Sequence, residues 1–97
     1  MNTIQHFKIP SDIQDINDPS KVIIDMPFGA TCFAVQDPWG QGSERGLIFA
    51  IVSDEATIVK AEFRLYQNKD TVGVNKGDLT YLGYLVEKGY FVFSVGK

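Results

Sequence analysis

The segment between Val22 and Val52 constrains the fold more than any other part of the chain. Two apolar runs, Val22 to Asp25 and Gly46 to Val52, flank a middle segment whose side chains alternate between two faces. The loops between these runs are rich in Gly and Pro, which favour turns over continued strands. This pattern is typical of β-hairpins, and it predicts a small all-β domain.

Strand-like segments account for most of the remaining chain as well. The polar segment 11–20 is expected to form a turn, with at most one short helical turn. About seven strands joined by short turns predict an antiparallel sandwich or a partly open barrel, because both architectures hide strand edges. The strands are expected at Thr3–Ile9, Val22–Asp25, Thr31–Asp37, Gly46–Ser53, Thr57–Gln67, Leu79–Glu87 and Tyr90–Val95.

Length and composition predict one folded unit. A chain of 97 residues cannot supply two hydrophobic cores, so residues 1–97 are expected to form a single β domain. The content of 44% hydrophobic and 12% aromatic residues exceeds what disordered chains carry. The chain is therefore expected to be globular.

Charge and cysteine content narrow the range of partners and compartments. The formal net charge of −3 would repel a long polyanion, so binding to DNA or RNA is not expected. Cys32 is the only cysteine, which fits a reducing compartment. The start of the chain has no apolar signal region, and no apolar run is long enough to cross a bilayer. A soluble, cytoplasmic protein with no membrane partner is expected.

The loop from Trp39 to Gly46 superficially resembles a dinucleotide-binding fingerprint. Its third glycine is one position late, and the loop leads into a strand where the fingerprint requires a helix. A weaker interpretation remains, in which backbone N–H groups approach a phosphate, Arg45 pairs with it and Trp39 stacks on a base. The alternative is an ordinary hairpin loop with Trp39 folded back on the sheet.

A second candidate surface lies on the segment from Thr57 to Gln67. Its alternation predicts that Arg64 and Tyr66 face outward, while Lys69 follows just beyond the strand. Arginine binds phosphate through a planar fork and tyrosine can stack on a base, so this face could bind a nucleotide. The alternative is a solvated outer strand face without a ligand.

No arrangement of residues indicates catalysis or metal binding. A nucleophilic pair of Cys32 and His6 would need a third orienting group and a lowered thiol pKa, and an inert buried thiol is the favoured interpretation. The ligands of a zinc site are missing, and the acids of segment 11–20 lack the spacing of a calcium loop. We therefore expect no enzyme activity, no cofactor and no metal.

Several short motifs carry a resemblance to a known family. They are Met26-Pro27-Phe28-Gly29-Ala30, Phe33-Ala34-Val35-Gln36, Phe63-Arg64-Leu65, Tyr81-Leu82-Gly83 and the hairpin with Gly89 before Phe91-Val92-Phe93. Together they resemble a family of small phage-encoded β-domains of unknown function, over about three quarters of the chain. The chain departs from this family in the turn 67–71, where relatives carry a turn containing Gly and His.

The resemblance implies a phage accessory protein made in the cytoplasm of the bacterial host. In size and character, the chain is also similar to viral sponges that sequester cyclic nucleotide signals of bacterial defence, such as those of the anti-CBASS type. A sponge must bind without reacting, so aromatic planes, one or two arginines and backbone donors would suffice. The expected ligand contacts are Trp39, Arg45, Arg64, Tyr66 and Lys69.

A homo-oligomer is expected, because a small sheet with free edges pairs readily with a second copy. Phe28, at the tip of a predicted turn, would either anchor a subunit contact or cap the core. Two other functions remain open. One is a protein-interaction module that inhibits a host or defence protein, and the other is a minor structural virion component.

Overall fold

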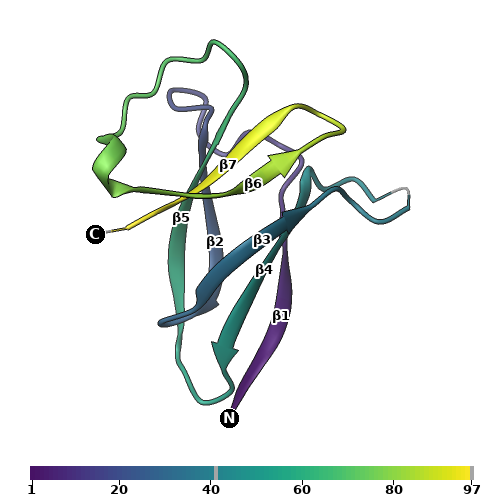
Figure 1. The fold of residues 1–97 in the computed structure, drawn as a ribbon, viewed down its shortest axis with the longest axis vertical. Helices are drawn as coiled ribbons and strands as arrows, with labels where there is room; N and C mark the ends of the chain where they lie inside the picture. The colour runs from purple at the N-terminus through teal and green to yellow at the C-terminus, as the bar shows by residue number, and fades with distance from the viewer. Residues whose placement is uncertain (41, 97) are drawn as a thin grey trace.

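A computed structural model describes residues 1–40 and 42–96 of the chain, and it confirms the all-β prediction (Figure 1). In the described residues, seven strands and one short 3₁₀ turn follow one another along the chain. They are β1 (Asn2–Ile9), β2 (Lys21–Pro27), β3 (Thr31–Gln36), β4 (Gly46–Ser53), β5 (Ile58–Tyr66), η1 (Lys76–Asp78), β6 (Leu79–Leu85) and β7 (Tyr90–Val95). Within these residues, no helix has the length and apolar character that crossing a membrane requires.

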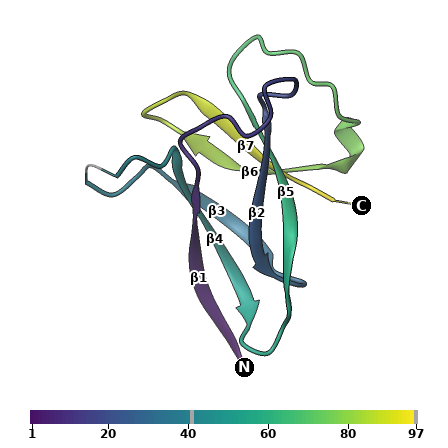
Figure 2. The same ribbon diagram turned by 180° about the vertical axis from the view of Figure 1, so that it is seen from behind.

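The strands form two antiparallel sheets that face each other. One sheet has three strands in the order β1-β4-β3, and the other has four strands in the order β2-β5-β7-β6. Figures 1 and 2 show the two sheets from opposite sides, with β4 and β5 in the interior of their sheets. The described strands form two separate sheets and do not close into a barrel; two sheets packed face to face are a sandwich, one of the two forms predicted.

The hydrophobic core lies between the sheets because each strand alternates its side chains. On β4, Ile48 points into the core while Phe49 faces outward, next to His6 of β1. The four-stranded sheet contributes Phe63 and Leu65 from β5. The buried cluster comprises Ile9, Val22, Ile24, Met26, Ile48, Phe63, Leu65, Leu85 and Val92.

The predicted turn after the second strand is present, but the strand is longer than expected. β2 continues through Met26, which is buried in the core, to Pro27. The turn then closes with a hydrogen bond from the Ala30 N–H to the Pro27 carbonyl, 3.2 Å long, and Gly29 has a φ of +78°. Phe28 is 68% exposed at its tip, so it does not cap the core.

The two sheets come close together where β3 passes β6. An ideal Cβ built at Gly83 would lie 2.7 Å from Cγ2 of Val35, so the approach leaves no room for a side chain. The ladder between β6 and β7 also shifts register between Tyr81 and Gly83, which is typical of a β-bulge. Glycine at position 83 therefore allows this edge of the sandwich to narrow.

Two long loops lie at the same end of the molecule, opposite the N-terminus (Figures 1 and 2). The first, residues 10–20, contains turns closed by hydrogen bonds from Asp18 N to Asp15 O and from Lys21 N to Asp18 O, 3.0 and 3.1 Å long. The second, residues 67–75, leads to η1, which is the short helical turn of the described chain. Segment 11–20 therefore forms turns, as predicted, and it contains no helical turn in the structure.

Candidate functional site

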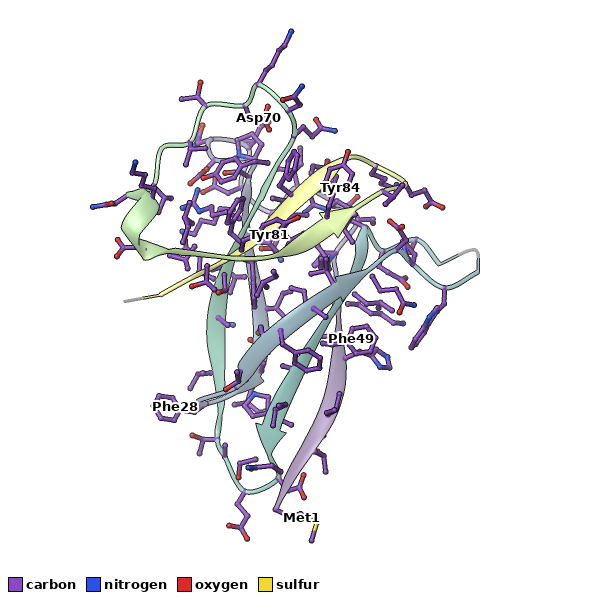
Figure 3. The ribbon with its side chains drawn as sticks, viewed as in Figure 1. Met1, Phe28, Phe49, Asp70, Tyr81 and Tyr84 are labelled. Carbon is purple, nitrogen blue, oxygen red and sulfur yellow. The ribbon has the colours of Figure 1, made fainter. Side chains whose placement is uncertain are left out.

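Two adjoining hollows lie under the two long loops. Figure 3 shows Asp70, in the second loop, at the opposite end of the molecule from Met1. The first hollow, of about 220 Å³, is lined by Ile13, Pro19, Ser20, Arg45, Leu65, Gln67, Asp70 and Tyr90. The second, of about 250 Å³, is lined by Asp18, Pro19, Ser20, Tyr66, Asp70 and Thr71. Because both share Pro19, Ser20 and Asp70, we call them the paired hollows.

Arg45 is the buried cation of the first hollow. The residue is only 4% exposed. Its Nε donates a hydrogen bond to the Pro10 carbonyl, 2.7 Å long. The guanidinium carbon lies 5.6 Å from the ring centroid of Tyr90, in a cation–π arrangement. Its Nη2 is buried and has no hydrogen-bond partner among the described residues. A buried guanidinium with an unused donor favours an added anionic acceptor at this place.

Tyr66 carries the second buried donor without a partner. Its residue is 5% exposed, and its ring packs against Phe93 with the centroids 6.0 Å apart. The hydroxyl is buried and makes no hydrogen bond with the described residues. The paired hollows therefore bring together two unsatisfied polar groups at one end of the sandwich, one from the loop residue just before β4 and one from the last residue of β5. Buried polar groups are rarely left unpaired in folded proteins.

The prediction that Arg64 and Tyr66 face solvent is wrong. The alternation of β5 does place both on the outer face of its sheet, since Phe63 and Leu65 point into the core. However, Arg64 is only 9% exposed. Loop 10–20 contacts it through Asp18, so the outer face at this end of the sheet is covered.

The positive charge of Arg64 is already paired with two carboxylates of the protein. Its Nη1 lies 2.8 Å from Oδ2 of Asp18, and its Nη2 lies 2.7 Å from Oε2 of Glu62. Burial lowers the pKa of Arg64, but hydrogen bonds and the charges of Glu62 and Asp18 outweigh it and raise that pKa above its ordinary value. Arg64 also donates to Oγ of Ser20, so it fixes the wall of the paired hollows and offers little charge to a ligand.

Trp39 and Lys69 lie away from the walls of the paired hollows. Trp39 is 54% exposed and packs edge-on against His6, with the ring centroids 4.9 Å apart. It therefore folds back on the three-stranded sheet, as the alternative interpretation of its loop predicted. Lys69 is exposed in the turn between Gln67 and Asp70, with a φ of +75°. Neither residue lines either hollow.

The glycine-rich loop does not offer an open phosphate cradle in its described part. At Gly42, an ideal Cβ would lie 2.6 and 2.7 Å from the carboxylate oxygens of Glu44, so this carboxylate covers the glycine backbone. A carboxylate at this position repels phosphate. Gln41, which belongs to the predicted loop, lies outside the described residues.

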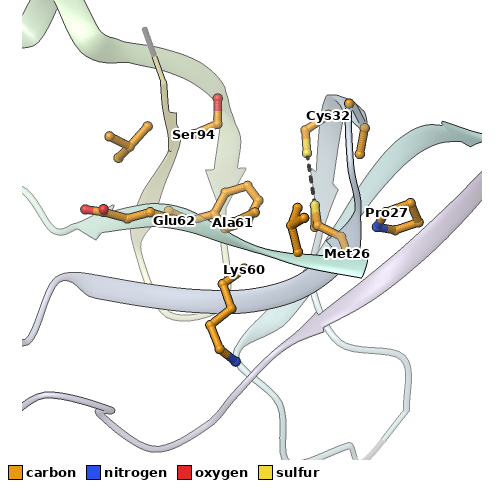
Figure 4. Close-up of a pocket in the computed structure, with 12 residues that line it drawn as sticks. Met26, Pro27, Cys32, Lys60, Ala61, Glu62 and Ser94 are labelled. Carbon is orange, nitrogen blue, oxygen red and sulfur yellow. Dashed lines mark hydrogen bonds between the residues drawn. The ribbon is translucent and has the colours of Figure 1, made fainter. Parts of the chain in front are cut away.

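A larger hollow of about 380 Å³ lies beside Cys32. Its described lining residues include no buried polar side-chain atom without a hydrogen-bond partner. Figure 4 shows the Cys32 and Met26 sulfur atoms facing each other, with Sγ donating to Sδ over 3.9 Å. Burial raises the pKa of the Cys32 thiol above its ordinary value, which disfavours the reactive thiolate. His6 lies on the opposite face of the same sheet, because its partner is Phe49 whereas Cys32 pairs with Ala50. The two residues do not form a nucleophilic pair.

Sequence reasoning identified Arg45 and Tyr66 but missed the other walls of their hollows. Asp70, Pro19 and Ser20 stand in polar loops that were interpreted only as turns, and Tyr90 was assigned only to a strand.

In the described residues, no group of three or more His, Cys, Asp or Glu side chains could hold a metal ion. Comparisons with protein-family models, curated proteins and solved structures found no match to this chain.

Proposed function

We propose that this chain is a non-catalytic binding protein that sequesters a small anionic nucleotide signal in the paired hollows. The observation that carries the proposal is that Arg45 lines a hollow while its buried Nη2 lacks an acceptor in the described residues. Leaving such a group unpaired costs free energy, and an anionic ligand atom would remove that cost. The ligand gains a charge-assisted hydrogen bond in return.

The second ligand contact in this proposal is the hydroxyl of Tyr66. It is buried in the wall of the neighbouring hollow and can donate to, or accept from, a polar ligand group. Pockets for small molecules commonly have volumes of about 300–1,000 Å³. The hollows of about 220 and 250 Å³ reach this range only together, so one ligand would span both.

The biological setting belongs to the proposal as well. The motif resemblance supports a phage accessory protein that acts in the host cytoplasm and blocks antiviral signalling by removing a cyclic oligonucleotide. Capture needs no chemical step, so it is compatible with a half-buried thiol of raised pKa and the absence of a His–Cys pair in the described residues. A homo-oligomer, in which a second copy extends each site, is part of the same proposal.

Calorimetry with a panel of cyclic di- and trinucleotides tests the proposal. We expect saturable binding to the natural protein and at least a tenfold loss of affinity in Arg45→Gln, because the variant loses a charge-assisted contact. Trp39→Ala is the matched control and should bind normally, since Trp39 lines neither hollow. Thermal melting verifies that each variant is folded. An absence of heat and of thermal shift at high ligand concentration would end the proposal.

A second candidate function is favoured by exposed aromatic residues on the outer face of β6 and β7. The rings of Tyr84 and Phe91 pack with their centroids 4.7 Å apart and their planes tilted by 48°, and both residues are exposed. Tyr81 is exposed further along β6, and Figure 3 shows it together with Tyr84. Aromatic residues are enriched in protein interfaces, so this face would suit a protein-interaction module. A stoichiometric partner from host lysate that is lost in Tyr84→Ala, with a blank ligand panel, would favour this function.

A further inference from the structure

We infer that Asp70 makes the paired hollows selective for ligand groups with one negative charge, such as phosphodiesters, over groups with two, such as terminal phosphates. The inference rests on the proposed function, because it concerns the ligand of the same site. In this inference, Asp70 determines specificity by repelling a second negative charge, without contacting the anionic group of the ligand.

The charges around the hollows carry this inference. Among the lining residues, Arg45 is the one cation, whereas Asp18 and Asp70 are both carboxylates. Arg64, behind the wall, is shared between Asp18 and Glu62, so it cannot neutralise a ligand as well. Lys69 lines neither hollow, so its charge lies outside the lining. One ligand charge is therefore balanced by Arg45, and a second one meets no free cation in the lining.

Asp70 is the carboxylate that a second ligand charge would meet. It lines both hollows, so a ligand that spans them passes its side chain. Its Oδ2 accepts a hydrogen bond from the Gln67 N–H, 2.7 Å long, and its own N–H donates to the Gln67 carbonyl over 3.0 Å. This double link holds Asp70 in place, so the carboxylate does not turn away from an incoming anion. Asp70 is exposed, so solvent screens part of its charge, but a carboxylate held beside the ligand still repels a second negative charge.

The test compares two probes that differ by one charge. Adenosine 5′-monophosphate carries nearly two negative charges at neutral pH, since its second pKa is about 6. Its methyl ester is a phosphodiester with the same base and sugar and a single charge. We expect the natural protein to bind the methyl ester about tenfold more tightly in calorimetry, because the second charge of the monophosphate is uncompensated.

Asp70→Asn isolates the contribution of the carboxylate. Asparagine keeps an acceptor for the Gln67 N–H, so the turn is preserved, but the negative charge is lost. The preference for the methyl ester should fall to about one. Asp54→Asn is the matched control, because Asp54 follows β4 at the other end of the molecule, where its N–H donates to the Met1 carbonyl. It removes the same net charge and should leave the preference unchanged.

The outcomes separate the inference from the proposed function. If the natural protein binds the monophosphate as tightly as its ester, or if Asp70→Asn and Asp54→Asn behave alike, the inference is overturned while ligand capture stands. If neither probe nor any cyclic nucleotide binds, the proposed function fails and the inference fails with it. A preference for the ester that is lost only in Asp70→Asn supports the inference.

Discussion

Arg64 forms an ion pair with Asp18, which lies 46 residues away in the chain. Its Nη1 donates hydrogen bonds to the two carboxylate oxygens, 2.9 and 2.8 Å long. Arg64 stands on β5, whereas Asp18 belongs to the loop before β2. The same nitrogen also donates to Oγ of Ser20, and the Leu65 N–H donates to the Ser20 carbonyl over 2.9 Å. These bonds hold the loop against the outer face of the four-stranded sheet, and the loop in turn forms the shared wall of the paired hollows.

Replacing Arg64 with Ala should therefore destabilise the protein. We expect the free energy of unfolding to fall by about 2 kcal/mol, because several hydrogen bonds to charged groups are lost. Lys60→Ala removes the exposed ion pair with Asp25 and should change stability by less than about 0.5 kcal/mol. Urea denaturation of both variants measures the difference. Equal, small effects would contradict a structural role for Arg64.

Replacing Tyr66 with Phe should have opposite effects on stability and on binding. The variant removes a buried hydroxyl without a partner, so the free energy of unfolding should rise by about 1 kcal/mol. Ligand affinity should fall if the hydroxyl contacts the ligand as proposed. Tyr84→Phe, at an exposed position, should change neither quantity. Urea denaturation and calorimetry measure the two effects, and a destabilised Tyr66→Phe protein would show that the hydroxyl is already satisfied.

Replacing Gly83 with Ala should push β3 and β6 apart. The new methyl group would lie 2.7 Å from Cγ2 of Val35, and the φ of +155° at this position strains any residue other than glycine, so we expect a loss of about 1–3 kcal/mol in unfolding free energy. Gly73→Ala is the control, since nothing lies within 4 Å of its Cβ position. A double-mutant cycle with Val35→Ala should recover part of the loss. Additive effects in thermal or urea unfolding would contradict the close approach.

Cys32 should make the stability of the protein depend on alkaline pH. Burial raises the pKa of its thiol in the folded state. As pH rises above about 8.5, the unfolded thiol loses its proton while the folded thiol keeps it, so the unfolded state is favoured. The stability that Cys32 contributes is full below this pH and declines through the window up to the raised folded pKa. The difference in unfolding free energy between the natural protein and Cys32→Ala should therefore shrink from pH 7 to pH 9.5, and a constant difference would refute the prediction.

The strand pattern was predictable because alternation is a local property of the chain. In β5, the identity of Phe63 and Leu65 as inward residues and of Arg64 and Tyr66 as outward residues follows from a period of two. Likewise, Gly29 after Pro27 predicts a turn with a positive φ, and the structure contains it. Such features depend on neighbours in sequence, so one sequence suffices to find them.

The candidate site could not be predicted in the same way. An outward residue is exposed only if nothing covers its face, and loop 10–20 covers Arg64 through Asp18. Arg45 and Tyr66 were identified as separate contacts on different segments, with no sign that Asp70 would line both of their hollows. Their proximity depends on how two loops pack over the end of two sheets.

The sequence by itself determined the all-β class, the position of each strand and the side of the sheet on which most residues lie, because these follow from local periodicity and turn chemistry. The tertiary structure alone decided which outward residues are buried, which charges are paired and which donors are left over. These outcomes depend on contacts between residues such as Asp18 and Arg64, which are far apart in the chain and brought together only when the loops close over the sandwich.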